Sequence, residues 1–302
     1  MSFFLRLRYI AEYAVLRLLW LVLRALPPSR AYDLGAAFGG LWYRCSGARR
    51  RVAVENVLAA GVAASRPEAE RIACASFRHF TGHLLENLKA PLVIHAGNWR
   101  EHVTCEGSEE AFALLLAADG PVLLATAHLG CWEIAGYWTS LHRPLFAVAR
   151  PMNNPYAQRF LLREHFRTDL TLLPKNRAFS PETIRAWEER RAALAIVMDQ
   201  HAGRSGVWMN VLGRPASVHT SPARLHLMTG FPLLFGCLIR VGPLQYRAIG
   251  GAPIRFVPTG DRERDTRAVL AQLTGSLETL IRRYPEQYLW MHRRWRTPPP
   301  AA

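Results

Sequence analysis

The sequence predicts an α/β protein whose central sheet is largely parallel and flanked by helices. Four short and mostly apolar runs, as expected for strands buried on both faces, lie at residues 121–127, 145–149, 192–198 and 232–240. Helical patterns lie between them, near residues 131–141, 155–166, 181–190 and 221–229. Strands that alternate with helices in this way are typical of parallel sheets, because each parallel pair needs a crossover connection.

Helices are also predicted before and after this alternating region. Residues 51–61 and 67–88 carry apolar side chains at every third or fourth position, and Gly61 ends the first of these helices. A last amphipathic helix is predicted from about Arg267 to Arg283. Its apolar side is formed by Val269, Leu270, Leu273, Leu277, Leu280 and Ile281.

The N-terminal segment, residues 1–28, is predicted to be a membrane anchor or an interfacial helix. On a helix Arg6, Arg17 and Arg24 fall within about 20° of one another, so a basic stripe borders a wide apolar face. This arrangement suits a helix lying in the membrane interface. A tilted span with snorkelling arginines is an alternative, although Arg17 would cost about 2.5–3.5 kcal/mol near its centre. An amphipathic helix packed on the protein's own core is another.

The remainder, residues 29–302, is predicted to be a single domain, since no internal repeat or interdomain linker interrupts it. The formal charge of +15 indicates an anionic partner: nucleic acid, an acidic membrane surface, or an acidic protein or substrate. The densest basic run, residues 44–51, favours the anionic cytoplasmic leaflet. No nucleic acid is expected, because neither a basic helix with base-reading residues nor an aromatic RNA-binding motif occurs.

His128 is the first candidate catalytic residue. It follows the predicted strand 121–127, and active sites in open α/β sheets gather at the carboxyl ends of strands. Glu133 lies five positions later, in the first turns of a predicted helix, so that its carboxylate can reach the imidazole across the Leu129-Gly130 junction. It would then fix the tautomer and leave the other ring nitrogen as a base. A histidine that caps the turn and a metal ligand are the alternatives.

Several other kinds of site are disfavoured by what the sequence lacks. No H-E-x-x-H pattern or carboxylate cluster with ligand spacing occurs, so we expect no metal, and no cofactor is expected either. The five cysteines are widely spaced and include no C-x-x-C pair, which favours free thiols in a reducing compartment. The absence of G-x-S-x-G, Walker and G-x-G-x-x-G motifs excludes serine hydrolase, P-loop and Rossmann sites.

Five blocks of the sequence, taken in order, resemble those of one known family. "AHLGCWE" (127–133) resembles the H-x4-[DE] block of the lysophospholipid acyltransferase superfamily. Four further blocks resemble the bacterial lauroyl and myristoyl transferases of lipid A biosynthesis: "ARPMNNP" (149–155), "MDQHAGRSGVWMNVLGRPAS" (198–217), "SPARLHLMTGFPLL" (221–234) and "YPEQYLWMHRRWRTPPP" (284–300). The similarity covers most of the chain. It departs at Cys131, where members often have asparagine, and at His201, where they often have an acid.

The resemblance implies acyl transfer from a thioester to a hydroxyl of a phosphorylated glycolipid, a lipid A precursor. The expected donor is acyl carrier protein, with coenzyme A as the alternative, and the expected location is the cytoplasmic face of the inner membrane. His128 would remove the hydroxyl proton while Glu133 orients the imidazole and stabilises the imidazolium. Cys131 is not expected to act as a nucleophile, because a thiolate leaving group makes a covalent enzyme intermediate unnecessary.

The same resemblance suggests further site residues. Arg150 and Arg167 would bind phosphate through their guanidinium groups, and ordinary surface charge is their alternative. Asp199 resembles a functional acid of the family, although it could instead cap the next turn. Gln200 belongs to the same D-Q stretch and is expected to bind substrate. The run His292-Arg293-Arg294 is expected either to be structural or to form part of a basic face for the carrier protein.

Three other functions remain open from the sequence. The same fold and dyad could act on another lipid acceptor, such as an aminolipid, a lysophospholipid or a different glycolipid. A non-catalytic membrane adaptor could keep the fold and bind acyl carrier protein, although it would have no reason to keep both His128 and Glu133. A metal-dependent hydrolase would need bound metal.

Overall fold

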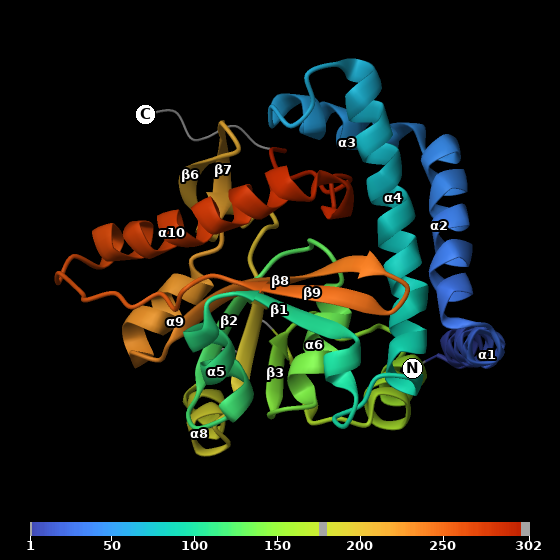
Figure 1. The fold of residues 1–302 in the computed structure, drawn as a ribbon, viewed down its shortest axis with the longest axis horizontal. Coiled ribbons are helices and arrows are strands. Elements are labelled where there is room, and N and C mark those ends of the chain that lie inside the picture. Colours follow the sequence, from blue (N-terminus) through green and yellow to red (C-terminus); the bar gives the residue numbers. More distant parts are fainter. Residues whose placement is uncertain (1, 175–179, 297–302) are drawn as a thin grey trace.

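A mixed sheet forms the centre of the molecule in the computed structural model, which describes residues 2–174 and 180–296 (Figure 1). Within these residues the sheet has seven strands in the order β1-β9-β8-β2-β5-β3-β4. Their bounds are β1 Val103–Gly107, β2 Val122–Thr126, β3 Leu145–Val148, β4 Leu170–Leu173, β5 Ala193–Val197, β8 Leu233–Gly242 and β9 Gln245–Gly250. Every neighbouring pair is parallel except β8 and β9, so the predicted α/β class is confirmed. Strands β6 (Val207–Val211) and β7 (Arg214–Val218) form a separate hairpin.

Helices cover both faces of this sheet (Figure 1). Their bounds are α1 Phe3–Ala25, α2 Pro28–Cys45, α3 Gly47–Ala59, α4 Arg66–Lys89, α5 Glu109–Ala117, α6 Trp132–Ser140, α7 Pro155–Arg159, α8 Pro181–Glu189, α9 Ser221–Thr229 and α10 Arg262–Arg283. A π-helical segment, Phe160–Phe166, continues α7. Short 3₁₀ turns occur at Ala90–Leu92, Trp99–Glu101, Gly203–Ser205 and Pro285–Gln287.

Strand β2 shows how the sheet separates two hydrophobic cores. Its alternate residues Leu123 and Ala125 belong to the core formed with α3, α4, α8, α9 and α10. Val122 and Leu124 belong to the core on the other face, formed with α5 and α6. Successive side chains of a strand point to opposite faces. Residues with even numbers at the end of β2 therefore face the side of α5 and α6.

Each strand and helix predicted for the alternating region is present, with ends that differ by a few residues. The elements that the sequence did not predict are α2, α5, β1, β4, β9 and the β6–β7 hairpin. Helix α2 is rich in glycine, which ordinarily disfavours a helix. A Cβ atom at Gly35 or Gly39 would overlap the backbone of α4 at Thr81 or Phe77, so these glycines allow the two helices to pack closely.

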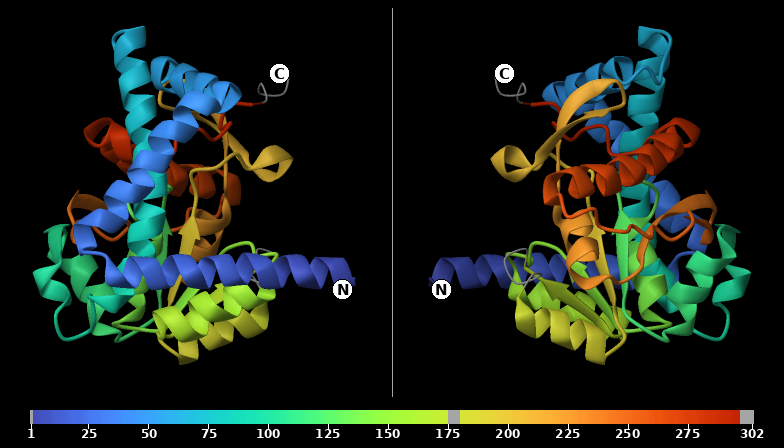
Figure 2. Two further views of the ribbon diagram at one scale, coloured as in Figure 1. Left: turned by 90° about the vertical axis from the view of Figure 1, so that its right-hand side faces the viewer. Right: turned by 90° about the vertical axis from the view of Figure 1, so that its left-hand side faces the viewer.

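Helix α1 packs on the body of the protein along part of its length. Leu23 is fully buried in a small cluster with Ala31 and Leu88, and Nε1 of Trp20 donates to Nδ1 of His165 over 3.1 Å. The N-terminal part of α1 extends beyond the neighbouring elements (Figure 2). Among the described residues, no helix has both the length and the apolar character needed to cross a membrane. The boundary at residue 28 and the membrane contact of α1 stay predictions.

Candidate active site

The parallel pairing of β2 with β5 brings His128 and Asp199 together. Thr126 pairs with Val197 in this register, so the residues two positions beyond each strand end lie at the same level. Nδ1 of His128 lies 2.8 Å from Oδ1 of Asp199, a short hydrogen-bond distance. The sequence predicts this orienting contact for Glu133, but in the structure Asp199 makes it.

The turn from His128 to Glu133 is held by two other parts of the chain. Gly130 has a φ of +70°, and a Cβ atom there would overlap the carbonyl oxygen of Leu238, so glycine is required. The Gly130 amide donates to the carbonyl oxygen of Gln287 over 3.0 Å, and the Leu289 amide donates to that of His128 over 3.0 Å. Strand β8 and the C-terminal segment therefore fix the backbone on which the candidate base sits.

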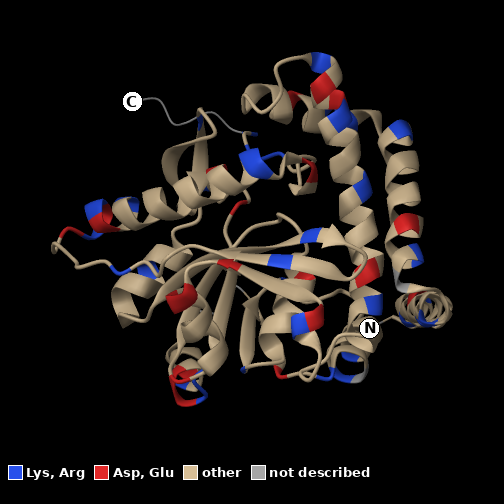
Figure 3. Ribbon diagram, viewed as in Figure 1, with Lys and Arg blue, Asp and Glu red and all other residues tan. Residues whose placement is uncertain are grey.

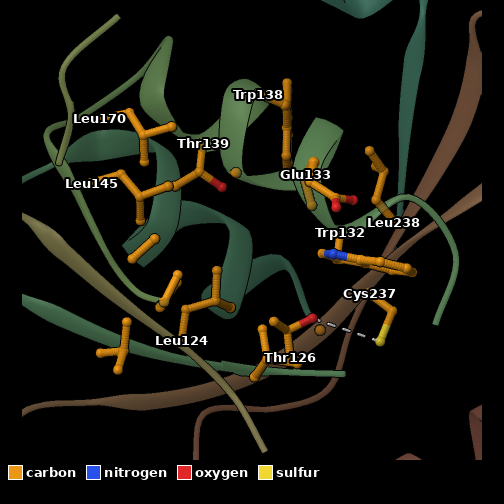
Figure 4. Close-up of a pocket in the computed structure, with 18 of the residues that line it drawn as sticks. Leu124, Thr126, Trp132, Glu133, Trp138, Thr139, Leu145, Leu170, Cys237 and Leu238 are labelled. Carbon is orange, nitrogen blue, oxygen red and sulfur yellow. Dashed lines mark hydrogen bonds between the residues drawn. The ribbon is translucent and has the colours of Figure 1, made fainter. Parts of the chain in front are cut away.

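Glu133 lies in the first turn of α6 and faces the same cavity as His128 (Figure 4). Its Oε2 atom lies 3.3 Å from Nε2 of His83 on α4. The helix begins at Trp132, and the indole of this residue is the group that packs edge-on to the His128 ring, with centroids 5.0 Å apart. The predicted hydrogen bond between His128 and Glu133 is therefore replaced by two separate contacts, His128 with Asp199 and Glu133 with His83.

The electrostatics of the pair favour an ionised Asp199. Burial alone would raise the pKa of Asp199, but the adjacent His128 and then Arg294 lower it to about 2. For His128, burial lowers the pKa, while the charge and hydrogen bond of Asp199 and the charge of Glu133 outweigh it and raise the pKa above its ordinary value. Because an ionised carboxylate only accepts, Nδ1 of His128 carries the proton and Nε2 is left as the basic nitrogen.

The pKa of Glu133 is shifted in the opposite direction from that of Asp199. Burial raises the pKa of Glu133 to about 7, against the lowering effects of its own backbone amide and of His128. Two carboxyl groups beside one imidazole thus have widely separated pKa values, a pattern that is common where acid and base roles are divided. Cys131 in the same turn is fully buried, and burial raises the pKa of its thiol, which opposes a nucleophilic role.

An apolar cavity of about 670 Å³ opens at His128 and extends between the sheet and helices α5 and α6. Figure 4 shows Trp132 and Glu133 at one end and Leu145 and Leu170 at the other. Small residues on the walls leave this space open: Ala111, Ala135, Gly136, Ala147, Ala195, Gly236, Ala248 and Gly250. The volume falls within the range of small-molecule sites, and the mostly apolar lining suits a hydrocarbon chain.

The remaining predicted residues differ in their relation to this cavity. Nε2 of Gln200 lies 3.3 Å from Nε2 of His128, so its amide can donate to the basic nitrogen. Arg150 is exposed and lines the cavity, and its predicted role in binding substrate phosphate stays a prediction. Arg167 is exposed at the end of the π-helical segment and is not among the described residues that line the cavity.

Some residues near the site were not predicted. Arg159 and Arg163 line a second, shallower cavity of about 530 Å³ that shares Met152, Gln158 and Leu162 with the first. The two arginines are four residues apart in a stretch that is predicted to be helical, and this spacing places them on the same side of a helix. Arg294 is buried rather than part of a basic face, which favours the structural alternative given for it. For His79 and His83 the sequence predicts only a place on an amphipathic helix.

The chain belongs to the family of bacterial lipid A biosynthesis acyltransferases, because the model of that family matches residues 2–297. It is 25% identical over 299 residues to the lipid A biosynthesis palmitoleoyltransferase of Escherichia coli, covering 98% of this chain and 94% of that protein. It is 24% identical over 301 residues to the lipid A biosynthesis lauroyltransferase of the same organism, covering 97% and 93%. It is also 26% identical over 225 residues to a phosphatidylinositol mannoside acyltransferase of Mycobacterium tuberculosis, covering 71% and 68%. The family predicted from the sequence is confirmed, and the chain is an acyltransferase of lipid acceptors.

Proposed function

We propose that this protein transfers a fatty acyl chain from the thioester of acyl carrier protein to a hydroxyl of a lipid A precursor, at the cytoplasmic face of the inner membrane. The observation that carries the proposal is the place of His128, which is held by Asp199 at 2.8 Å and opens onto an apolar cavity of about 670 Å³. A base at the mouth of a hydrocarbon-sized tunnel is what acyl transfer to a hydroxyl requires.

In the proposed reaction, Nε2 of His128 removes the proton from the acceptor hydroxyl as its oxygen attacks the thioester carbonyl. The carbon–oxygen bond forms, the carbon–sulfur bond breaks, and the proton passes from the imidazolium to the departing thiolate. The imidazolium lies beside the ionised Asp199 and faces Glu133, so charge that develops during attack is stabilised in a buried site. Gln200 holds Nε2 before the acceptor arrives and must give way to it.

The cavity supplies the proposed donor site. The acyl chain would run from the carbonyl at His128, past Leu124 and Thr139, toward Leu145 and Leu170 (Figure 4). Burial of each methylene contributes about 0.8 kcal/mol, so a chain that fills the cavity is held far more strongly than a short one. No covalent acyl-enzyme is required, since the thiolate is itself a good leaving group.

Charge at the cavity mouth suits the proposed acceptor and membrane. Arg150 lines the main cavity, and Arg159 with Arg163 lines the adjoining one, so phosphate groups of a glycolipid would meet guanidinium donors there. Arg167 is exposed on the same segment and stays a candidate. Lys and Arg positions also lie along α1, α2 and α4 (Figure 3), which suits the anionic surface of a cytoplasmic leaflet.

The test is mass spectrometry of the acceptor after incubation with the detergent-solubilised protein. Acyl carrier protein thioesters of several chain lengths and a tetra-acylated lipid A precursor are the substrates, with coenzyme A thioesters in parallel. A gain of one acyl chain that is lost in His128→Ala supports the proposal. No gain with any donor, from protein whose unfolding transition is intact, would rule out this acceptor.

A second acceptor class is favoured by one comparison. The similarity to a phosphatidylinositol mannoside acyltransferase extends over 71% of the chain, and that relative's name identifies a different glycolipid. The same incubation with a phosphatidylinositol mannoside, an aminolipid and a lysophospholipid distinguishes these acceptors. A non-catalytic adaptor would transfer no chain to any of them.

A further inference from the structure

His83 is a buried titratable residue to which the proposed mechanism gives no role. It lies on α4 with its side chain fully buried, and its Nε2 atom is 3.3 Å from Oε2 of Glu133. This distance is slightly longer than the usual N–H···O separation. Neither ring nitrogen makes a regular hydrogen bond with any residue that the structure describes. A buried polar group in this state costs free energy, so its presence calls for a functional or structural reason.

The ring of His83 is fixed by aromatic contacts on several sides. It stacks on His79, with centroids 5.6 Å apart and planes 18° apart, and it meets the indole of Trp132 edge-on at 4.3 Å. Phe80 makes a third ring contact at 6.1 Å. These contacts confine the ring, and Nε2 lies 3.3 Å from Oε2 of Glu133 without the alignment of a regular hydrogen bond.

Helix α4 contacts the turn from His128 to Glu133 at two points through one face. Nε2 of His79 lies 3.0 Å from the carbonyl oxygen of Gly130, and one helical turn later His83 reaches Glu133. Residues four apart lie on the same side of a helix, so the pair is built to meet this turn. His79 acts on the backbone, whereas His83 acts on the side chain of Glu133.

The surroundings keep His83 neutral. Burial lowers the pKa of His83 well below its ordinary value, and the rings of His79 and His128 lower it further. The titratable group that acts on Glu133 from the other side is His128, and the neighbouring Trp132 also lowers the pKa of Glu133 through a hydrogen bond. A neutral imidazole carries one N–H, and Glu133 is the acidic side chain within ion-pair distance of Nε2 in the described part of the chain.

We propose that His83 is a positioning residue for Glu133: its neutral ring donates the Nε2 proton to the Glu133 carboxylate and holds it facing His128 across the cavity. The inference rests on the proposed function, in which the Glu133 carboxylate stabilises the imidazolium. Donation to the ionised form favours the carboxylate against the effect of burial. The same interaction keeps the Glu133 carboxylate away from Nδ1 of His128, and this nitrogen remains hydrogen-bonded to Asp199.

The first test compares two substitutions of His83 in the full-length protein. His83→Phe keeps a ring that can pack on His79 and Trp132 but removes both nitrogens, whereas His83→Gln keeps a donor near the Nε2 position. We expect kcat to fall about 10–100-fold in His83→Phe with little change in KM, as for other supporting residues of catalytic groups. His83→Gln retains most of the activity. His226→Phe is the matched control, because His226 is also buried on a helix but bonds to the carbonyl oxygen of Phe231, outside the site.

The pH profile and a double mutant separate positioning from a merely structural role. Without its donor the Glu133 carboxylate is harder to ionise, so the rising limb of kcat moves to higher pH in His83→Phe. If His83 acts only through Glu133, then His83→Phe with Glu133→Gln is no slower than Glu133→Gln alone. Additive losses, wild-type kcat in His83→Phe, or a His83→Gln enzyme as slow as His83→Phe would each overturn the proposal.

A measurement that needs no turnover keeps the inference separate from the proposed function. In protein labelled with ¹⁵N-histidine, the His83 ring is assigned from the signal lost in His83→Gln. We expect a neutral ring protonated at Nε2 from about pH 5 to 8, with nitrogen shifts that change in Glu133→Gln. A ring protonated at Nδ1, or a charged ring, would overturn the proposal even if the enzyme is active. A wild-type protein that transfers no acyl chain would instead overturn the proposed function.

Discussion

Asp199 decides which nitrogen of His128 carries the proton. Its ionised oxygen accepts the Nδ1 proton at 2.8 Å, and its charge offsets the effect of burial on the imidazole. In the proposed mechanism this contact leaves Nε2 without a proton, since an imidazole of the other tautomer would present a proton to the acceptor.

Asp199→Asn is expected to lower kcat by about 10²–10⁴-fold, because an amide can hydrogen-bond to the wrong tautomer. The substitution also removes the charge that raises the pKa of His128. His128 must be neutral to act as a base, so the remaining activity should persist to lower pH than in the wild type. Steady-state kinetics from about pH 5 to 9 check both effects. Asp169→Asn, which alters a surface pair with Arg190, is the control and should match the wild type.

Glu133 should make the folded protein less stable as pH rises. Its pKa in the folded state is about 7, compared with 4.5 for the ordinary group. Between these values the folded state binds more protons than the unfolded state, so stability falls with increasing pH. Glu133→Gln should therefore be more stable than the wild type at pH 8, with a smaller difference at about pH 4.5. Urea unfolding at the two pH values measures this, and Glu188→Gln on the surface of α8 is the control. A difference independent of pH would contradict the expectation.

At the scale of single elements, helix α6 carries Glu133 at its start and forms a wall of the cavity along its length. Gly136 lies one turn after Trp132 on this helix, and a Cβ atom there would sit 3.6 Å from Cδ2 of Leu145. Leu145 is at the end of the cavity remote from Glu133 (Figure 4). The absence of a side chain at this position therefore lengthens the cavity.

Gly136→Leu is expected to shorten the preferred acyl chain, because the new side chain occupies the far end of the cavity. The loss should be largest for the longest thioesters, by about tenfold for each two methylenes that no longer fit. Competition between thioesters of different length, analysed by mass spectrometry of the product, measures the preference. Gly275→Ala, in an open position of α10, is the control for a glycine removed from a helix. An unchanged order of chain lengths would contradict this use of the cavity.

The strands and helices of the sheet could be predicted because their patterns are local. Apolar runs identified β2, β3, β5 and β8, and periodicity identified the helices that follow them. The order of the strands could not be predicted, and the site depends on it. Asp199 reaches His128 because β2 and β5 are neighbours in register, although 71 residues separate the two side chains. The sequence placed Asp199 at a strand end, yet only the topology shows which strand lies beside it.

A local sequence pattern also cannot predict which groups the side chains of α4 contact. His79 and His83 occupy one face of an amphipathic helix, and such residues are ordinary core histidines unless a polar group meets them. The neighbouring turn supplies those groups in the Gly130 carbonyl and the Glu133 carboxylate. Helix α2 was missed for another reason, because its glycines suggest a loop until the backbone of α4 is seen against them.

At the scale of the whole molecule, α1 presents an apolar face that the rest of the described chain leaves exposed. Phe4 is 82% exposed and Leu18 is 64% exposed, while Leu23 on another side of the helix is buried. Arg17 and Arg24 lie between these two sides on a helical wheel. The arrangement fits a helix that rests on the protein by one side and on a membrane surface by another.

Phe4→Glu combined with Leu18→Glu is expected to weaken binding to vesicles that contain anionic phospholipid by at least tenfold, because two apolar side chains each contribute about 1.5–3 kcal/mol on burial. Sedimentation with vesicles measures binding, and thermal unfolding should be unchanged. Val257→Glu is the matched control, since Val257 is 86% exposed in the segment before α10. Equal binding by the wild type and the double variant would show that α1 does not contact the bilayer.

The turn that carries His128 depends on contacts with residues that are synthesised long after it. Gln287 accepts from the Gly130 amide, Leu289 donates to His128, and Asn56 of α3 donates to the Trp290 carbonyl. A growing chain on the ribosome can form α1 long before these residues emerge. Until they do, the turn that carries His128 lacks these supports. The backbone around His128 would therefore reach its final geometry only after the segment around residue 290 has left the ribosome.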